Sequence, residues 1–279
     1  MNNKIKAIFL IAITIIIISL VLIHKKDDYS SYDFKIYFFN AGKSDAIILS
    51  KNDHYIMIDT GEEDLSDDIL KYFKNNNITK LDYLIITHFD KDHVGSASTI
   101  IDNIEIGEVL QSNVPKESEY YNNYISSLES KNITPVTIEG DYAIALDDLE
   151  IVVNGPDKIY DSNESNNSSL IVSVKDNENK FLFMGDAQNA RIKDFMSINN
   201  DEYDFLKVPY HGNYLKRLDD LIEVKNIKYA VITSSNIELE DEDTIKVLND
   251  YNVKYYLTRN GSITVLSDGN DIVIKQWLF

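Results

Sequence analysis

Two histidines and two aspartates lie within six residues, directly after an apolar run. Residues 87–95 read THFDKDHVG, which places His88, Asp90, Asp92 and His93 close together. Imidazole nitrogens and carboxylate oxygens are the donors that zinc and manganese accept in proteins. Because a turn after a buried strand directs several side chains to one point, this spacing predicts a metal site more strongly than an ordinary polar loop.

Three other segments place an Asp or a His just after an apolar run. They contain Asp59 in the sequence IDTG, Asp186 in FMGD and His211 in VPYHG. Each signal is weak alone, since an Asp beside a Gly is more often a turn residue and a single His is more often structural. Loops that follow strands gather at one edge of a sheet, so these residues are candidates for the same site.

The composition limits the chemistry further. The chain of 279 residues has no Cys, which excludes disulfides, thiol nucleophiles and Cys-ligated zinc. Its 46 acidic and 27 basic residues give a net charge of −19, which excludes a broadly basic protein that coats nucleic acid. A local basic strip, or a metal ion facing a phosphate, remains compatible with that charge.

Hydrophobic patterns predict the elements that position these residues. Strands are expected at 34–39, 46–49, 55–58, 81–86, near 109, and at 134–138, 142–145, 149–153, 170–174, 181–184, 206–208, 229–233, 253–257, 262–266 and 272–276. Helices are expected at 64–76, 96–103, 116–131, 215–224 and 243–251. Strands with interspersed helices in both halves indicate one α/β domain over residues 34–279.

The first residues differ from the rest of the chain. Residues 7–23 form an uncharged apolar run at the short end of what spans a bilayer, with lysines on both sides. The run predicts an uncleaved signal-anchor over residues 1–26 and a linker over 27–33, with the domain at the membrane and outside the cytoplasm. A cleaved signal peptide, which would give a secreted protein, and a buried helix of the domain are the alternatives.

The order of these motifs resembles the metallo-β-lactamase superfamily, whose central motif is HxHxDH; Asp90 stands here for the second His. The surrounding residues are similar to the hydrolase domain of ComEC-type DNA-uptake (competence) proteins. The likeness extends to FNAGKSDA at 39–46, NNSSL at 166–170, LKVPYHG at 206–212 and TRNGSI at 258–263. It covers about residues 34–275, and it implies a four-layer αββα sandwich with a one- or two-metal site at the sheet edge.

Carried over position by position, the resemblance implies a ligand set divided between two ions. The ligands are His88, Asp90, Asp92, His93, Asp186 and His211. His88 and Asp90 would hold one ion, and Asp186 would bridge it to the other. The chain has Asn167 and Ser168 where many superfamily members supply a further His to the first ion. More carboxylate and fewer imidazoles favour manganese, or zinc held loosely, so zinc and manganese both remain candidates.

The resemblance also implies roles in the reaction. A metal-bound hydroxide would be the nucleophile, and Asp92, Asp186 and Lys207 are the catalytic candidates. Asp59 would fix the metal loop through hydrogen bonds. Lys207 would either meet a phosphate or be an exposed lysine at the end of a strand. Tyr210 would either face the substrate or pack.

Three functions remain open. The first is metal-dependent hydrolysis of a phosphodiester, by resemblance that of a nuclease acting on DNA or another nucleic acid. The second is hydrolysis of a small-molecule or cell-envelope ester or phosphoester, which the acidic balance favours because it repels polyanions. The third is a non-catalytic scaffold that binds metal.

The sequence also places Tyr120, Tyr121 and Tyr124 on one expected helix. These tyrosines would either form a stacking surface for bases or pack against a sheet.

Overall fold

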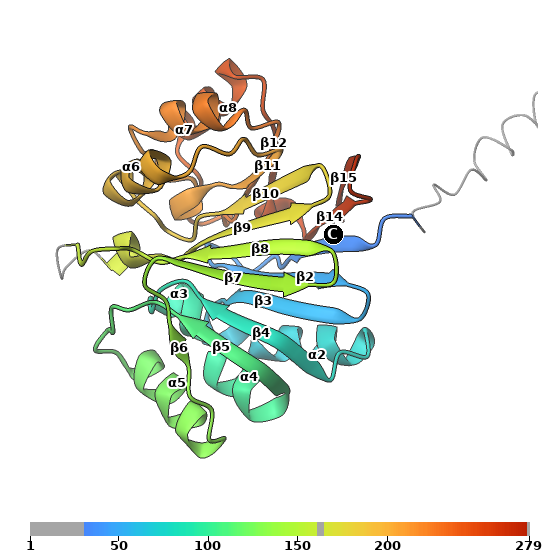
Figure 1. Cartoon of the computed structure of the whole chain (residues 1–279), viewed down its shortest axis with the longest axis vertical. Helices are drawn as coiled ribbons and strands as arrows, with labels where there is room; N and C mark the ends of the chain where they lie inside the picture. The colour runs from blue at the N-terminus through green and yellow to red at the C-terminus, as the bar shows by residue number, and fades with distance from the viewer. Residues whose placement is uncertain (1–30, 161–164, 278–279) are drawn as a thin grey trace, which may run out of the picture. The chain divides into compact units, whose positions relative to one another are not determined.

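Two β-sheets face each other, and helices cover the outer face of each sheet (Figure 1). The computed structural model describes residues 31–160 and 165–277. The predicted signal-anchor at 1–26 and the first part of the predicted linker lie outside the described residues. Within the described ranges, no helix has both the length and the apolar content that crossing a bilayer requires.

The first sheet is mixed. In spatial order its strands are β15 (Ile272–Gln276), β14 (Ile263–Ser267), β1 (Phe34–Phe38), β2 (Ala46–Lys51), β3 (His54–Thr60), β4 (Lys80–Ile86), β5 (Glu105–Gln111) and β6 (Val136–Thr137). Strands β3, β4, β5 and β6 are parallel, and the other neighbours pair antiparallel. The parallel strands therefore all end at one edge of the sheet.

The second sheet repeats this division. Its strands, in order, are β13 (Lys254–Leu257), β12 (Tyr229–Ile232), β11 (Phe205–Lys207), β10 (Asn179–Phe183), β9 (Ile171–Asp176), β8 (Leu149–Asn154) and β7 (Asp141–Leu146). Strands β10 to β13 are parallel, whereas β7, β8, β9 and β10 pair antiparallel. Each sheet thus has a parallel half whose strand ends can carry loops with chemistry.

The helices divide between the two outer faces. The helices are α2 (Ser66–Asn75), α3 (Lys91–Val94), α4 (Ala97–Asn103), α5 (Glu119–Ser130), α6 (Asn189–Ile198), α7 (Leu218–Lys225) and α8 (Glu242–Asp250). Single 3-10 turns are η1 (Glu63–Leu65), η2 (Ser165–Ser168), η3 (Pro209–Gly212) and η4 (Thr258–Asn260). Figure 1 shows α2, α4 and α5 over the first sheet and α6, α7 and α8 over the second.

Alternation along the strands creates the core between the sheets. In β1 the side chains of Phe34, Ile36 and Phe38 are buried, and Phe34 packs edge-on against Phe181 of β10 at 5.3 Å between ring centres. Successive residues of a strand point to opposite faces, so the same strand also serves the helix side, where Tyr37 stacks on Tyr72 of α2. The predicted αββα sandwich is confirmed.

Three helices differ from the sequence expectation, and one of them, expected at 215–224, begins at Leu218. The helix expected at 116–131 begins at Glu119, because the Ser118 hydroxyl accepts a hydrogen bond from the Tyr121 backbone at 3.1 Å and acts as the N-cap. No helix was expected where α6 lies. Its first residues have no local cap, and the distant Asn167 Oδ1 accepts from the Arg191 backbone instead. A cap from another segment leaves no signal at the start of the helix.

Candidate metal centre

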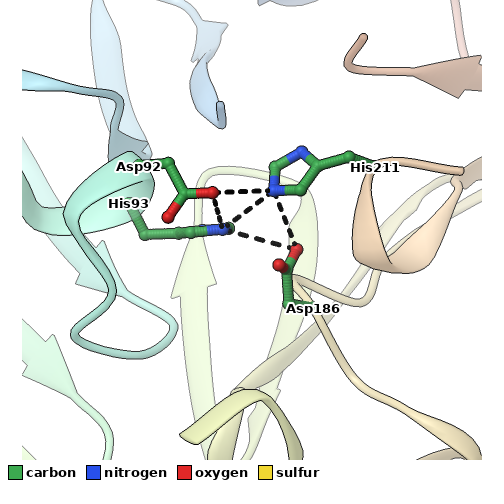
Figure 2. Close-up of side chains that lie close together, drawn as sticks. All are labelled: Asp92, His93, Asp186 and His211. Atoms are coloured by element: carbon green, nitrogen blue, oxygen red, sulfur yellow. Dashed lines mark hydrogen bonds and ion pairs between the residues drawn. The ribbon is translucent and has the colours of Figure 1, made fainter. Parts of the chain in front are cut away.

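Four of the predicted ligands converge on one point at the edge of the sheets. Asp92 and His93 lie on α3, which follows β4, whereas Asp186 follows β10 and His211 lies in η3 after β11. Figure 2 shows the four side chains pointing toward one another from these three segments. We call Asp92, His93, Asp186 and His211 the centre. Two of its side chains come from each half of the molecule.

The spacing within the centre suits a single metal ion. His93 Nε2, His211 Nε2 and Asp186 Oδ1 lie 3.3 Å from one another. Asp92 Oδ2 lies 3.2 Å from His211 Nε2 and 3.9 Å from His93 Nε2. Donors that bind zinc at about 2.1 Å in a tetrahedron are about 3.4 Å apart. One donor atom from each residue therefore fits one coordination sphere, and all four lie within 4.8 Å of one another.

Unpaired buried atoms give independent support for a cation. Five buried side-chain atoms of the described residues lack a hydrogen-bond partner, and Asp186 Oδ1 and His88 Nε2 are two of them. Leaving a buried carboxylate oxygen without a donor is costly. Asp186 Oδ1 belongs to the centre, so a metal ion is the partner that its chemistry fits, whereas His88 Nε2 lies outside the centre, 3.8 Å from Asp90 Oδ1.

The His93 ring is held in the orientation that a ligand needs. Its Nδ1 lies 2.7 Å from Asp59 Oδ2, so an Nδ1–H donated to this carboxylate leaves Nε2 free for the centre. Asp59 also accepts from the backbone and hydroxyl of Thr87, at 2.7 and 2.6 Å. Asp59 thus lies behind the centre and connects the end of β3 to the loop after β4.

His211 reaches the centre from a turn of unusual geometry. Eleven described residues other than Gly have positive φ, and all but Tyr210 and His211 are Asn or Asp. Left-handed backbone is unfavourable for such side chains and is found where surrounding structure imposes it. Tyr210 donates its backbone N–H to Gly185 O at 3.2 Å, which ties this turn to the loop that carries Asp186.

A chain of hydrogen bonds orients His211. Its Nδ1 lies 2.9 Å from the Thr233 hydroxyl, which donates to Asp45 Oδ1 at 2.7 Å. The hydroxyl can therefore accept an Nδ1–H from the imidazole, which leaves Nε2 to face the centre. Asp45 was not among the predicted site residues, although it lies within the FNAGKSDA segment that carries part of the family resemblance.

The position of Lys207 differs from both positions expected from the sequence, which were a contact with a phosphate and an exposed strand end. Its side chain is fully buried, so it is not an exposed lysine at the end of a strand. The ammonium forms an ion pair with Asp45 and donates to Gly185 O at 3.1 Å, and it lies 3.8 Å from Asp186 Oδ1. These contacts are internal, so Lys207 lies beneath the centre and balances carboxylate charge where a phosphate contact was expected.

The two side chains predicted to hold the first ion, His88 and Asp90, do not converge as the four ligands of the centre do. His88 is buried near the centre, and its ring centre lies 4.1 Å from that of His93. His88 Nε2 and Asp90 Oδ1 are 3.8 Å apart. Asp90 Oδ1 also accepts from Lys116 Nζ and from the Ser165 hydroxyl, each at 2.6 Å. Asp90 therefore has two donors that the sequence analysis did not foresee.

The carboxylates control the protonation of the centre. Burial lowers the pKa of His211, but Asp186 and Asp45 outweigh it and raise this pKa to about 9. Burial raises the pKa of Asp186, yet His211 and His93 hold it well below its usual value. Without a metal ion, the imidazoles thus hold protons that the carboxylates attract. A divalent cation that binds must replace these protons.

The tyrosines serve mainly as packing. Tyr124 is fully buried against Phe89, with ring centres 5.9 Å apart, and donates to Gln111 Oε1 at 2.8 Å. Tyr121 packs edge-on against Phe89 at 4.7 Å. Tyr210 is half-buried against the core beneath α6 to α8. The stacking surface considered for Tyr120, Tyr121 and Tyr124 is thus largely a contact between α5 and the first sheet.

Comparison with known proteins supports the family resemblance. A family model described as the metallo-beta-lactamase superfamily matches residues 40–234. ComE operon protein 3 of Bacillus subtilis is 24% identical over 209 residues, covering 70% of this chain and 26% of that protein. Recombination protein 2 of Haemophilus influenzae is 26% identical over 200 residues, covering 70% and 23%. The chain thus spans about a quarter of the length of these relatives.

A solved structure shares the fold. The metallo-beta-lactamase fold protein YhfI from Bacillus subtilis aligns with a TM-score of 0.55 at 9% identity, over 87% of this chain and all of that chain. The predicted resemblance to the superfamily is confirmed, and the two curated relatives support the likeness to ComEC-type proteins.

Proposed function

Because this chain belongs to the metallo-beta-lactamase superfamily and converges four ligand side chains on one point, we propose that it is a metal-dependent hydrolase. The observation that carries this proposal is the mutual 3.3 Å spacing of His93 Nε2, His211 Nε2 and Asp186 Oδ1. A divalent ion bound there would act as a Lewis acid and lower the pKa of water toward neutrality.

The protein's own residues leave one side of the centre open. The Asp92 side chain is 23% exposed, whereas those of His93, Asp186 and His211 are at most 5% exposed. Burial raises the pKa of Asp92, but its hydrogen bond to His211 and the nearby imidazole of His93 hold this pKa below its usual value. Asp92 is therefore an ionised, accessible carboxylate that can accept a proton on the side from which a substrate approaches.

We propose a phosphodiester as the substrate, and DNA or another nucleic acid as its source. The support is the likeness to ComE operon protein 3 and Recombination protein 2, which this chain matches over a quarter of their length. The Lys116 side chain is 39% exposed at the rim of the centre, where its ammonium pairs with Asp90. DNA transport is not part of the proposal.

An ester or phosphoester of a small molecule or the cell envelope is the second candidate. The observation in its favour is the net charge of −19, which repels a polyanion over distances within the screening length. The signal-anchor predicted at 1–26, or its cleavage, would place the domain outside the cytoplasm, where envelope substrates are found. That placement stays a proposal.

One experiment separates these functions. The full chain, loaded with manganese or zinc, is incubated with single- and double-stranded DNA, bis-p-nitrophenyl phosphate and p-nitrophenyl acetate. We expect cleavage of the phosphodiesters, and Asp92→Asn should abolish it. Asp194→Asn is the matched control, since its side chain is 26% exposed on α6 and pairs with Lys158. Cleavage of the acetate alone would favour the second candidate, and bound metal without any turnover would favour a scaffold.

A further inference from the structure

One carboxylate oxygen beside the centre is already bound to a cation from the protein. Asp90 Oδ1 accepts from Lys116 Nζ at 2.6 Å and from the Ser165 hydroxyl at 2.6 Å. The three residues come from three segments: the loop before α3, the loop before α5, and η2. An ammonium at hydrogen-bond distance satisfies the charge of Asp90 that a metal ion would otherwise meet.

From this contact we propose that the Lys116 ammonium takes the place of a second metal ion, so that the chain binds one divalent ion tightly, at the centre. The inference rests on the metal site of the proposed function, and not on the reaction or the substrate. It assigns Lys116 a role in setting the number of bound metal ions.

Within residues 31–160 and 165–277, few other donors lie near Asp90 to hold a second ion tightly. His88 contributes one buried nitrogen, Nε2, which lies 3.8 Å from Asp90 Oδ1. Asn167 Oδ1 is used by the backbone N–H groups of Gln188 and Arg191, at 3.2 and 3.3 Å. The Ser168 hydroxyl donates to Ser165 O. The segment from which other superfamily members were expected to supply a ligand therefore serves α6 and its own turn.

The balance of charge also favours a single divalent ion, bound at the centre. Around the centre, the carboxylates of Asp45, Asp59, Asp92 and Asp186 outnumber the single ammonium of Lys207. At Asp90, one carboxylate faces one ammonium. The centre therefore keeps an excess of negative charge for a divalent ion, while the Asp90 position is close to neutral, and Lys116 repels a further cation there.

Counting bound manganese tests the inference without substrate. Metal-free full-length protein is dialysed against micromolar free Mn²⁺, the bound ions per chain are measured, and electron paramagnetic resonance distinguishes an isolated ion from a coupled pair. We expect one isolated ion in the wild type. Lys116→Met should admit a second ion, with its dissociation constant lowered by at least about tenfold, and should show the signal of a coupled pair.

Matched variants isolate the charge of Lys116. Lys116→Arg keeps a cation and should retain one ion. Lys175→Met removes a lysine of similar exposure that pairs with Glu150 at 2.7 Å, and it should also retain one ion. Adding Asp90→Asn to Lys116→Met should remove the second ion again.

A wild-type protein that binds no ion would count against the metal centre of the proposed function. Two results would overturn the inference itself: two ions bound per wild-type chain, or a Lys116→Met protein that titrates like the wild type. Either result concerns metal number alone. Absence of phosphodiester cleavage with one ion bound would instead count against the proposed function and leave the role of Lys116 standing.

Discussion

Buried charges lie at both ends of the strands, and the two groups differ in how fully they are paired. At the end of β2, Lys51 Nζ lies 2.6 Å from Asp176 Oδ1 and 2.8 Å from Asp148 Oδ1, and Ser267 donates to Asp176 Oδ2 at 2.5 Å. We call Lys51, Asp148, Asp176 and Ser267 the Lys51 cluster. At the other end of β2, about 20 Å away along the strand, Asp45 leads to the centre, where Asp186 Oδ1 has no hydrogen-bond partner within the described chain.

This difference shows how a buried cluster that joins segments differs from one prepared for a ligand. In the Lys51 cluster, the Lys51 ammonium meets both the buried carboxylate of Asp176 and the exposed carboxylate of Asp148, so the group is complete in the protein itself. In the centre, the imidazole nitrogens and carboxylate oxygens are aimed at a common point, and the Lys207 ammonium, 3.8 Å from Asp186 Oδ1, pairs more closely with Asp45. We therefore expect changes in the Lys51 cluster to affect stability, and changes in the centre to affect metal binding and turnover.

The largest contrast is expected from one substitution made in both groups. Asp186→Asn should remove the metal ion and reduce turnover by more than about 100-fold, because even the residues behind metal ligands are worth 10–100-fold. Asp176→Asn should keep both metal and turnover per folded molecule. Metal content and hydrolysis of bis-p-nitrophenyl phosphate measure the two effects. Equal loss of activity in both variants would contradict the division.

Lys51→Met should have the largest effect on stability. It leaves Asp176, which is 1% exposed, as a buried charge without its ammonium, and such a change costs about 3–5 kcal/mol of the free energy of unfolding. Urea unfolding of the metal-free protein measures it. Lys175→Met is the control, since its pair with Glu150 is at the surface and should contribute little to stability. A weaker metal affinity in Lys51→Met would mean that the two ends are coupled.

The next largest difference is expected in the pH dependence of stability, which should come from the centre and not from the Lys51 cluster. The pKa of His211 is about 9 in the folded, metal-free protein, against 6.5 for the ordinary side chain. The folded state therefore binds more protons between these values, so this stabilisation is complete below pH 6.5 and is lost as pH rises through 9. The Lys51 pKa, raised by Asp148 and Asp176 despite burial, lies above this window.

Urea unfolding at pH 6.5, 7.5 and 9 in the presence of a chelator measures this loss, which should be a few kcal/mol at most. His211→Gln should reduce the dependence and leave a part that comes from His93, whose pKa Asp186 and Asp59 raise despite burial. Lys51→Met should leave the dependence unchanged. With metal bound, the sign should reverse, because rising pH removes the protons that compete with the ion. A metal-free protein that grows more stable from pH 6.5 to 9 would refute this account.

The smallest effect is expected behind His211. Thr233→Val removes the hydroxyl between His211 and Asp45, and it should weaken metal binding by about 10–100-fold while the fold is kept. Thr244→Val is the matched control, because the buried Thr244 hydroxyl has no hydrogen-bond partner among the described residues and can be replaced at little cost. Equal metal affinities in the two variants would show that the Thr233 bond does not position the imidazole.

The sequence predicted the position of a residue best where that residue belongs to a motif that follows a strand. The order of Asp59, residues 87–95, Asp186 and His211 predicted the fold through its resemblance to the metallo-β-lactamase superfamily, and the hydrophobic patterns predicted the strands that these residues follow. The parallel strands then bring their carboxyl ends together, so the ligands meet without further information. The residues whose positions were not predicted pair with distant segments of the chain. A local sequence pattern holds no information about such pairing.

Lys207, Lys116 and Asn167 illustrate those exceptions. A lysine at the end of a strand is ordinarily exposed, and Lys207 is buried only because Asp45 lies opposite it from another sheet. Lys116 meets Asp90 from a loop whose path depends on how α5 packs. Asn167 caps α6 from a separate turn. Each contact joins segments that are distant in the sequence, and the pair of Lys207 with Asp45 also joins the two sheets.

The origin of the ligands has a mechanical consequence. Asp92 and His93 belong to the first half of the chain and Asp186 and His211 to the second, roughly 90 or more positions further on. An ion held by all four acts as a cross-link between the sheets, and the chain must release it before the sandwich can open. By mass action, free metal should therefore protect the protein against proteases that attack opened chains, and metal starvation should shorten its lifetime.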